Sequence, residues 1–256
     1  MPPKTGHPKK KRKVSQLEVK QLPQRLLPID NPDKKWHEKW DAKRDPLNFP
    51  HPFRALLIGP PNSGKSTTIL NIIARVRPHF EKIIIIYPGG IEGTKEYDVL
   101  GSGDGIEFRE DFPAPDYFPT VKSKSAVKTL VIIDDMELRE IGGDQRAHLD
   151  RLFGHVSTHR NVSIMLGAQQ FFNVPPIARR LSNLFITWKP RDLRLLNEVS
   201  SRVGEDLAGI FNALRKNNHD SIWVDMTKGT PYPLRWNGYQ KINTEGGGEK
   251  QKEEGE

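Results

Sequence analysis

A glycine- and proline-rich loop between two apolar segments places the strongest constraint on the fold of this chain. The stretch LLIGPPNSGKSTTIL spans residues 56–70, and Gly59 to Ser66 matches the pattern G-x-x-x-x-G-K-[ST] at every fixed position. The pattern needs a strand before the loop and a helix after it, because backbone N–H groups and a helix N-terminus then surround an anion. The mainly apolar segment Arg54 to Gly59 predicts the strand, and the helical spacing from Lys65 to Val76 predicts the helix. The sequence therefore predicts a phosphate-binding loop.

Each position of this loop has a task in holding a nucleoside triphosphate. The glycines let the backbone turn its N–H groups inward around the phosphates. Lys65 can reach the β- and γ-phosphates, and the hydroxyl of Ser66 can bind Mg²⁺. We therefore expect ATP and Mg²⁺ as cofactors. The residues expected to contact the nucleotide are Gly59, Pro60, Pro61, Asn62, Ser63, Gly64, Lys65, Ser66 and Thr67.

Carboxylates follow a second apolar strand, in TLVIIDDMEL. A carboxylate at the carboxyl end of a neighbouring strand reaches the same magnesium from the other side, so Asp134 is expected in the metal shell together with Ser66. Asp135 occupies the place where an acidic residue would polarise the attacking water, and Glu137 is a second candidate. The alternative for Asp135 and Glu137 is a solvated strand end or a helix-starting carboxylate.

A polar pair follows a third apolar run, in NVSIMLGAQQ. Gln169 would lie at the tip of this strand, where a glutamine can hydrogen-bond the γ-phosphate or orient the water that attacks it. Gln170 is the alternate. Ordinary loop polarity would also account for the pair.

Apolar strands alternate with helical segments along the chain, which predicts an α/β fold with a mainly parallel central sheet flanked by helices. Residues 88–128 are rich in Gly, Pro, Asp and Ser and are expected to form a loop excursion with one short strand around Ile106 to Glu110. The other expected strands are Arg54 to Gly59, Lys82 to Pro88, Thr129 to Asp135, Asn161 to Gln169, Leu184 to Lys189 and Ser221 to Met226. The other expected helices are Asp144 to His155, Pro176 to Leu181 and Asp192 to Leu214.

The ends of the chain differ in composition from its centre. Residues 1–22 are expected to form a disordered basic tail, 23–52 a proline-rich arm, 53–243 the ATPase domain and 244–256 a disordered acidic tail. Pro8 to Val14, PKKKRKV, matches a nuclear import signal, although a generic basic tail or an engineered addition would look the same. Trp36 and Trp40 could stack on bases, but pinning the arm onto the core is the preferred interpretation.

Composition excludes several classes of protein. The chain has no cysteine, so it has neither disulfides nor thiolate metal sites. Its longest apolar runs are far below the roughly 20 residues that cross a bilayer, so we expect a soluble protein with no membrane partner. The formal net charge is +8, but six positive charges lie in the first 14 residues. The remaining chain is only mildly basic, which is compatible with DNA binding but not diagnostic of it.

Taken together, the motifs resemble those of FtsK–HerA type P-loop ATPases, and more closely those of genome-packaging ATPases of the poxvirus, giant-virus and Polinton kind. The segments that carry the resemblance are PFRALLIGPPNSGKST, TLVIIDD, HRNVSIMLGAQQFF, ARRLSN, WKPRD and HDSIWVDM, which lie within residues 50–226. The resemblance implies a P-loop NTPase of the RecA-like/ASCE type. Two departures are the Asp134-Asp135 pair, where the family commonly has Asp-Glu, and the import signal.

The resemblance also implies a function. Members of this group form oligomeric rings, here of about five or six subunits, that move double-stranded DNA into a capsid. The implied partners are double-stranded DNA, capsid proteins and a nuclear import receptor, and the implied location is the host nucleus or the virion. Such rings place an arginine in the neighbouring subunit's site, for which Arg160 is the first candidate and Arg179 or Arg180 the next. A surface ion pair or a DNA contact would equally explain each arginine.

Two other functions use a phosphate loop. A nucleotide or polynucleotide kinase would need an arginine-rich lid over the acceptor, and it would not need Asp135 or Gln169. A nucleotide-dependent nuclear recruitment factor would bind ATP, change its affinity for a partner and turn over little. Aspartate in place of glutamate at position 135 could mean slow hydrolysis, so DNA-stimulated turnover is the observation that separates these functions.

Overall fold

The computed structural model describes residues 49, 51–76, 79–90, 97–100, 104–119, 127–190 and 192–243. The expected basic tail (1–22), both tryptophans of the N-terminal arm and the expected acidic tail (244–256) lie outside the described residues. Of the arm itself, only residues 49, 51 and 52 are described.

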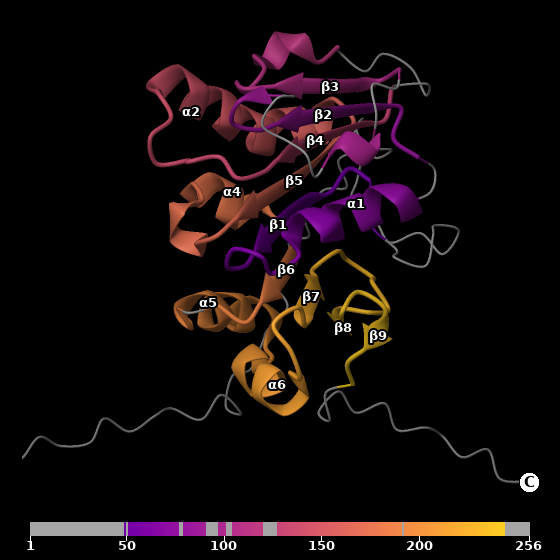
Figure 1. The fold of residues 1–256 in the computed structure, drawn as a ribbon, viewed down its shortest axis with the longest axis vertical. Coiled ribbons are helices and arrows are strands. Elements are labelled where there is room, and N and C mark those ends of the chain that lie inside the picture. Colours follow the sequence, from indigo (N-terminus) through magenta and orange to yellow (C-terminus); the bar gives the residue numbers. More distant parts are fainter. Residues whose placement is uncertain are drawn as a thin grey trace, which may run out of the picture. The chain divides into compact units, whose positions relative to one another are not determined.

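One sheet organises the described part of the chain (Figure 1). Its strand order is β3-β2-β4-β5-β1-β6-β7-β8-β9. The first six strands in this order run parallel, whereas β7, β8 and β9 are antiparallel to their neighbours. The strands are β1 (Arg54–Ile58), β2 (Lys82–Ile86), β3 (Ile106–Arg109), β4 (Thr129–Ile133), β5 (Val162–Ala168), β6 (Leu184–Trp188), β7 (Ser221–Asp225), β8 (Leu234–Trp236) and β9 (Gln240–Lys241). The predicted α/β class and mainly parallel sheet are confirmed.

Helices of several kinds connect the strands. The α-helices are α1 (Lys65–Arg75), α2 (Gly143–Arg151), α3 (Ser157–His159), α4 (Pro176–Leu181), α5 (Arg194–Val203) and α6 (Leu207–Leu214). A π-helical segment, η6 (Leu152–Val156), joins α2 to α3, and short 3₁₀ turns occupy η4 (Asp98–Leu100), η5 (Pro115–Tyr117) and η7 (Phe171–Asn173). The helix expected from Asp144 to His155 therefore extends from Gly143 to His159, with the π-helical segment in its middle.

The core has one apolar layer on each face of the sheet. Ile69, Ile72 and Ile73 of α1 pack with alternate strand residues such as Leu57 and Ile132. The opposite strand residues pack with α2, η6, α4, α5 and α6. Strands β1, β2 and β4 read as continuous apolar runs because both of their faces are covered.

Three strands bring the predicted site residues to one edge of the sheet. Strand β1 lies between β5 and β6, and its last residue, Ile58, is in register with Ala168 of β5. Strand β4 pairs with the other side of β5, where Ile133 is in register with Leu166. Because these strands are parallel, the loops that follow β1, β4 and β5 emerge side by side.

The prediction of a single helix from Asp192 to Leu214 is wrong. Two helices, α5 and α6, are separated at Gly204, which has φ +77° in the left-handed region and ends α5. The side chain of Asp206 then caps α6 by accepting from the N–H of Gly209 at 3.0 Å. The apolar spacing continues through the break because both helices pack on the same face, so periodicity alone did not reveal it.

The hairpin formed by β8 and β9 was not expected. It is short, and Arg235 and Gln240 interrupt its apolar pattern. Among the described residues, no helix has both the length and the apolar composition that crossing a bilayer requires.

Candidate nucleotide-binding site

The predicted phosphate loop connects β1 directly to α1. Its first residue, Gly59, donates its N–H to the carbonyl of Ala168 at 3.2 Å, which ties the loop to the end of β5. Asn62 has φ +57° and Gly64 has φ +100°, so the chain passes twice through the left-handed region before the helix begins. Gly64 is the N-cap of α1, and the first N–H groups of the helix face the loop without a side-chain cap.

Gly59 is required by close packing. A Cβ atom at this position would lie 2.6 Å from Ser63 Oγ and 2.8 Å from Cε3 of Trp188, at the end of β6. Both Ser63 and Trp188 are buried, so neither can easily move away. The first glycine of the motif thus lets the loop fold over a tryptophan that sequence reasoning did not single out.

Lys65 lies over its own loop. Its Nζ donates to the carbonyls of Gly59 and Pro60, each at 3.0 Å. Burial lowers the pKa of Lys65, while the charges of Asp134 and Asp135 oppose that shift. The ammonium group is therefore held between the loop carbonyls and the acidic end of β4, where a γ-phosphate would need a positive charge.

Ser66 and Asp134, the two predicted metal ligands, are in direct contact. The hydroxyl of Ser66 donates to Asp134 Oδ2 at 2.9 Å, and Asp134 is buried at the end of β4. Burial raises the pKa of Asp134, whereas hydrogen bonds from Tyr97 and Ser66 and the charge of Lys65 lower it. A hydroxyl and a carboxylate oxygen are the hard donors that Mg²⁺ prefers, so this pair fits the ion.

Tyr97 was missed by sequence reasoning. Its side chain is buried and its hydroxyl donates to the same Asp134 oxygen at 2.8 Å. Gly167 in β5 was also missed: a Cβ atom there would lie only 2.3 Å from Asp134 Oδ1. The glycine inside an otherwise apolar strand was the one sequence signal for this close approach.

Asp135 and Gln169 meet at the tips of β4 and β5. Gln169 Nε2 donates to Asp135 Oδ1 at 3.3 Å, and both side chains are exposed. Asp135 has φ +55°, which turns the chain sharply after the strand. Glu137 differs, because its carboxylate accepts from the N–H of Arg139 in its own turn. Asp135 therefore lies with Gln169 at the strand tips, whereas Glu137 is bonded within its own turn, and Gln170 directly follows Gln169.

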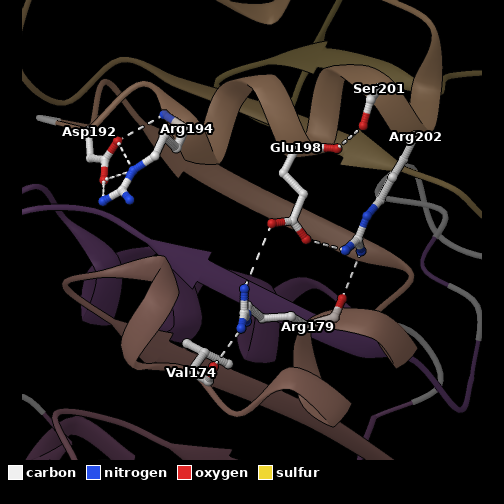
Figure 2. A network of polar contacts seen from close by, with 7 residues as sticks. All are labelled: Val174, Arg179, Asp192, Arg194, Glu198, Ser201 and Arg202. Carbon is white, nitrogen blue, oxygen red and sulfur yellow. Dashed lines mark hydrogen bonds and ion pairs between the residues drawn. The ribbon is translucent and has the colours of Figure 1, made fainter.

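The three candidate arginines occupy different surroundings. Arg160 precedes β5, at the edge of the sheet opposite the phosphate loop, and donates to the carbonyl of Phe118 at 3.3 Å. Arg179 is committed to internal contacts, which Figure 2 shows: it donates to the Val174 carbonyl at 3.1 Å and lies 3.8 Å from the Glu198 carboxylate of α5. Arg180 is exposed, and no described residue forms an ion pair with it.

Arg179 is part of a network that joins α4 to α5. Arg202 donates to the carbonyl of Arg179 at 2.8 Å and pairs with Glu198 at 2.5 Å. Arg194, the first residue of α5, pairs with Asp192 in the loop after β6 (Figure 2). The network holds these two helices together beside the site.

Two hollows adjoin the phosphate loop on different sides. The first, of about 320 Å³, is lined by Pro60, Pro61, Gln169, Gln170 and residues that include Arg139 and Arg194. The second, of about 470 Å³, is lined by loop residues together with Thr67, Thr68, Trp188 and His219. The Nε1–H of Trp188 donates to the His219 carbonyl at 3.1 Å, which holds this histidine against the loop. The second hollow lies beside the N-terminus of α1.

Comparison with solved structures finds the same fold in the genome packaging NTPase B204 from Sulfolobus turreted icosahedral virus 2. Its complex with AMP aligns with a TM-score of 0.52 and 19% identity over 75% of this chain and 99% of that chain. Its complex with AMPPCP gives a TM-score of 0.51 and 19% identity over 75% of this chain and 100% of that chain.

B204 from Sulfolobus turreted icosahedral virus, described as a DNA-packaging ATPase, gives a TM-score of 0.52 at 17% identity over 74% of this chain and 97% of that chain. No protein-family model matches the sequence, and no curated protein matches it. At these identities the comparison establishes the fold, which is that of a P-loop NTPase. The resemblance noted from the sequence is confirmed at this level.

Proposed function

We propose that this protein hydrolyses ATP and uses the energy to translocate double-stranded DNA, as a ring motor that packages a viral or virus-like genome. The observation that carries this proposal is the convergence of Lys65, Ser66, Asp134, Asp135 and Gln169 at one edge of the sheet. Lys65 and Ser66 begin α1, and the other three follow β4 and β5, so only the folded chain brings these residues together. The named activities of the structural neighbours support the same function.

The residues at this edge of the sheet have different roles in ATP hydrolysis. The backbone N–H groups of the loop and Lys65 bind and orient the phosphates. Ser66 and Asp134 would hold Mg²⁺, and the bound ion would neutralise negative charge on the phosphates. Within the described residues, no three His, Asp or Glu side chains gather into a metal site, which suits an ion that takes much of its coordination from phosphate oxygens and water.

Asp135 accepts the proton of the attacking water, and Gln169 orients that water. Their direct contact keeps both side chains at the tip of neighbouring strands. The exposure of this pair leaves room for a water molecule and a γ-phosphate beside it. The hollow lined by Thr67, Thr68, Trp188 and His219 would hold the nucleoside part, because it adjoins the start of α1.

The motor grips DNA through its phosphates. A motor has to move over every sequence, so contacts with base edges would not serve it. A ring of about five or six subunits multiplies the modest basic charge of each subunit around one pore. An arginine from the neighbouring subunit completes the site, and Arg180 is the best placed of the three candidates because it is exposed and is not committed to a described partner.

The cellular setting follows from the sequence motif and the resemblance. Pro8 to Val14 would bind a nuclear import receptor, which would bring the protein to the host nucleus, where it would meet capsid proteins and could enter the virion. Fusion of residues 1–22 to a fluorescent protein tests the import step. Replacing Lys10, Lys11 and Arg12 by alanine should abolish nuclear accumulation of the fusion.

The central experiment measures ATP hydrolysis by the 256-residue chain with and without long double-stranded DNA, at low and moderate salt, while light scattering follows its mass. We expect DNA to stimulate turnover of an assembly of about five or six subunits, and the stimulation to fall as salt rises. Lys65→Ala is the matched control and should abolish turnover. A monomer that binds ATP and ignores DNA would overturn the motor and favour a recruitment switch.

A further inference from the structure

Asp134 is held from more than one side. Its Oδ2 atom accepts hydrogen bonds from Ser66 at 2.9 Å and from Tyr97 at 2.8 Å. Its Oδ1 atom lies over the Cα of Gly167, where a Cβ atom would come within 2.3 Å. The carboxylate is therefore fixed in one orientation by the hydroxyls of Ser66 and Tyr97 and by the backbone of β5 at Gly167.

Tyr97 comes from a segment that supplies none of the site residues expected from the sequence. It follows β2 in the connection to β3 and immediately precedes η4, where the N–H of Leu100 donates to its carbonyl at 3.0 Å. Its side chain is wholly buried and packs with the apolar layer that also contains α1. A polar side chain buried this deeply is stabilised only when its hydroxyl is paired, and its partner is Asp134.

The hydroxyl of Tyr97 acts as a hydrogen-bond donor to Asp134 Oδ2. A protonated hydroxyl supports the ionised form of Asp134, because it donates to the carboxylate oxygen.

We propose that Tyr97 is a positioning residue for the metal-binding carboxylate of Asp134, and that the described turn at residues 97–100 thereby controls the Mg²⁺ affinity of the nucleotide site. The inference rests on the proposed function, since it concerns the same metal pair. Side chains that hydrogen-bond a metal ligand fix its orientation, and their loss typically costs about 10- to 100-fold in metal affinity or activity. Tyr97 thus makes the metal site depend on a segment remote from the phosphate loop in sequence.

Tyr97→Phe tests the proposal in the 256-residue chain. It keeps the buried ring and removes only the hydroxyl. Binding of a fluorescent ATP analogue is measured first in EDTA and then during titration with Mg²⁺. We expect the affinity in EDTA to match wild type and the half-saturating Mg²⁺ concentration to rise about 10-fold. Tyr239→Phe is the control, because that exposed tyrosine stacks on Arg75 through its ring, which phenylalanine preserves.

Gly167→Ala reaches the same carboxylate by a second route. The added Cβ would displace Asp134 Oδ1, so the half-saturating Mg²⁺ concentration should again rise while binding in EDTA is kept. Gly154→Ala is its control, since a Cβ there meets Ile177 and Leu181 at ordinary contact distances of 3.8 and 3.9 Å. Circular dichroism reports whether each variant folds.

The outcomes separate this inference from the proposed function. Wild-type binding that does not respond to Mg²⁺ would overturn both. A wild-type response to Mg²⁺ that is unchanged in Tyr97→Phe would overturn the role of Tyr97 alone. Equal losses of affinity in EDTA and in Mg²⁺ would show a purely structural role for the tyrosine, and that result would also overturn the inference.

Discussion

At the scale of single residues, two glycines allow the backbone to lie close to side chains of the site. Gly59 lets the phosphate loop lie on Trp188, and Gly167 lets β5 lie against the carboxylate of Asp134. Neither glycine takes part in chemistry. A Cβ at position 59 would clash with Ser63 and Trp188, and a Cβ at position 167 would clash with Asp134.

The assignment of the base is testable by a pair of amide substitutions. Asp135→Asn should keep ATP binding and lower hydrolysis about 100-fold or more, because the amide cannot accept the proton of water. Asparagine tolerates the left-handed conformation of residue 135, so the backbone should be preserved. Steady-state hydrolysis and equilibrium binding of ATP provide the two measurements.

Glu137→Gln is the matched control for that substitution. Its carboxylate accepts a hydrogen bond from the N–H of Arg139 in its own turn, so we expect hydrolysis close to wild type. Normal turnover by Asp135→Asn together with loss of turnover by Glu137→Gln would reverse the assignment.

At the scale of elements, backbone conformation decides where helices end. The left-handed Gly204 separates α5 from α6, and open space surrounds the position where a side chain would begin. Gly204→Ala should therefore lower the free energy of unfolding by about 1–2 kcal/mol through backbone strain alone. Chemical denaturation measures this change.

Gly142→Ala is the control for Gly204→Ala. Gly142 also has open space around it, but its φ of −60° is one that alanine adopts readily. Gly142 is the N-cap of α2, where glycine is preferred to alanine, so we expect a loss below about 1 kcal/mol. Equal effects of the two substitutions would refute backbone strain as the cause.

A buried ion pair joins β7 to the unexpected strand β8. Arg235 Nη2 lies 3.3 Å from Asp225 Oδ2, and the two side chains are 5% and 4% exposed. Removing one partner leaves a buried charge, so Arg235→Ala should lower the free energy of unfolding by about 3–5 kcal/mol at neutral pH. Lys241→Ala, on exposed β9, should change it by less than about 0.5 kcal/mol.

The loss caused by Arg235→Ala should depend on pH. Burial raises the pKa of Asp225, so the folded protein takes up this proton more readily than the unfolded chain does. Without Arg235 the pKa rises further, and protonation removes the uncompensated charge. The variant should therefore regain stability relative to wild type as pH falls from 7. A loss that stays constant from pH 7 to pH 5 would contradict this account.

At the scale of the whole molecule, the proposed ring predicts that subunits share their sites. Arg180→Ala and Lys65→Ala should each abolish or strongly reduce hydrolysis alone. Mixing them should restore part of the activity, because some interfaces then combine an intact phosphate loop with an intact arginine. Turnover measured across mixing ratios gives the test.

Arg160→Ala and Arg179→Ala are the comparisons in the same assay. Arg179 belongs to the network between α4 and α5, so its loss should lower the free energy of unfolding and should not be complemented by mixing. Complementation by Arg160→Ala in place of Arg180→Ala would move the shared arginine to the start of β5.

Local patterns in the sequence were sufficient for much of the fold and part of the site. The phosphate loop, the strand ends at Asp134 and Gln169, and the mainly parallel sheet all follow from short-range rules, because residue spacing and apolar runs act over a few neighbours. The break at Gly204 was missed because apolar spacing continued across it. The sequence did not decide which arginine would enter a neighbouring subunit's site in the proposed ring, because it carries no record of which surface meets another copy.

Only the tertiary structure decided which distant residues support that site. Tyr97, Gly167, Trp188 and His219 reach the phosphate loop and Asp134 from separate segments, and their contacts depend on strand order and register. Periodicity determines which face of an element is buried, but it leaves open which other element covers that face. The sequence by itself therefore determined the presence of a phosphate-binding loop with an acidic partner, and packing decided how that partner is held.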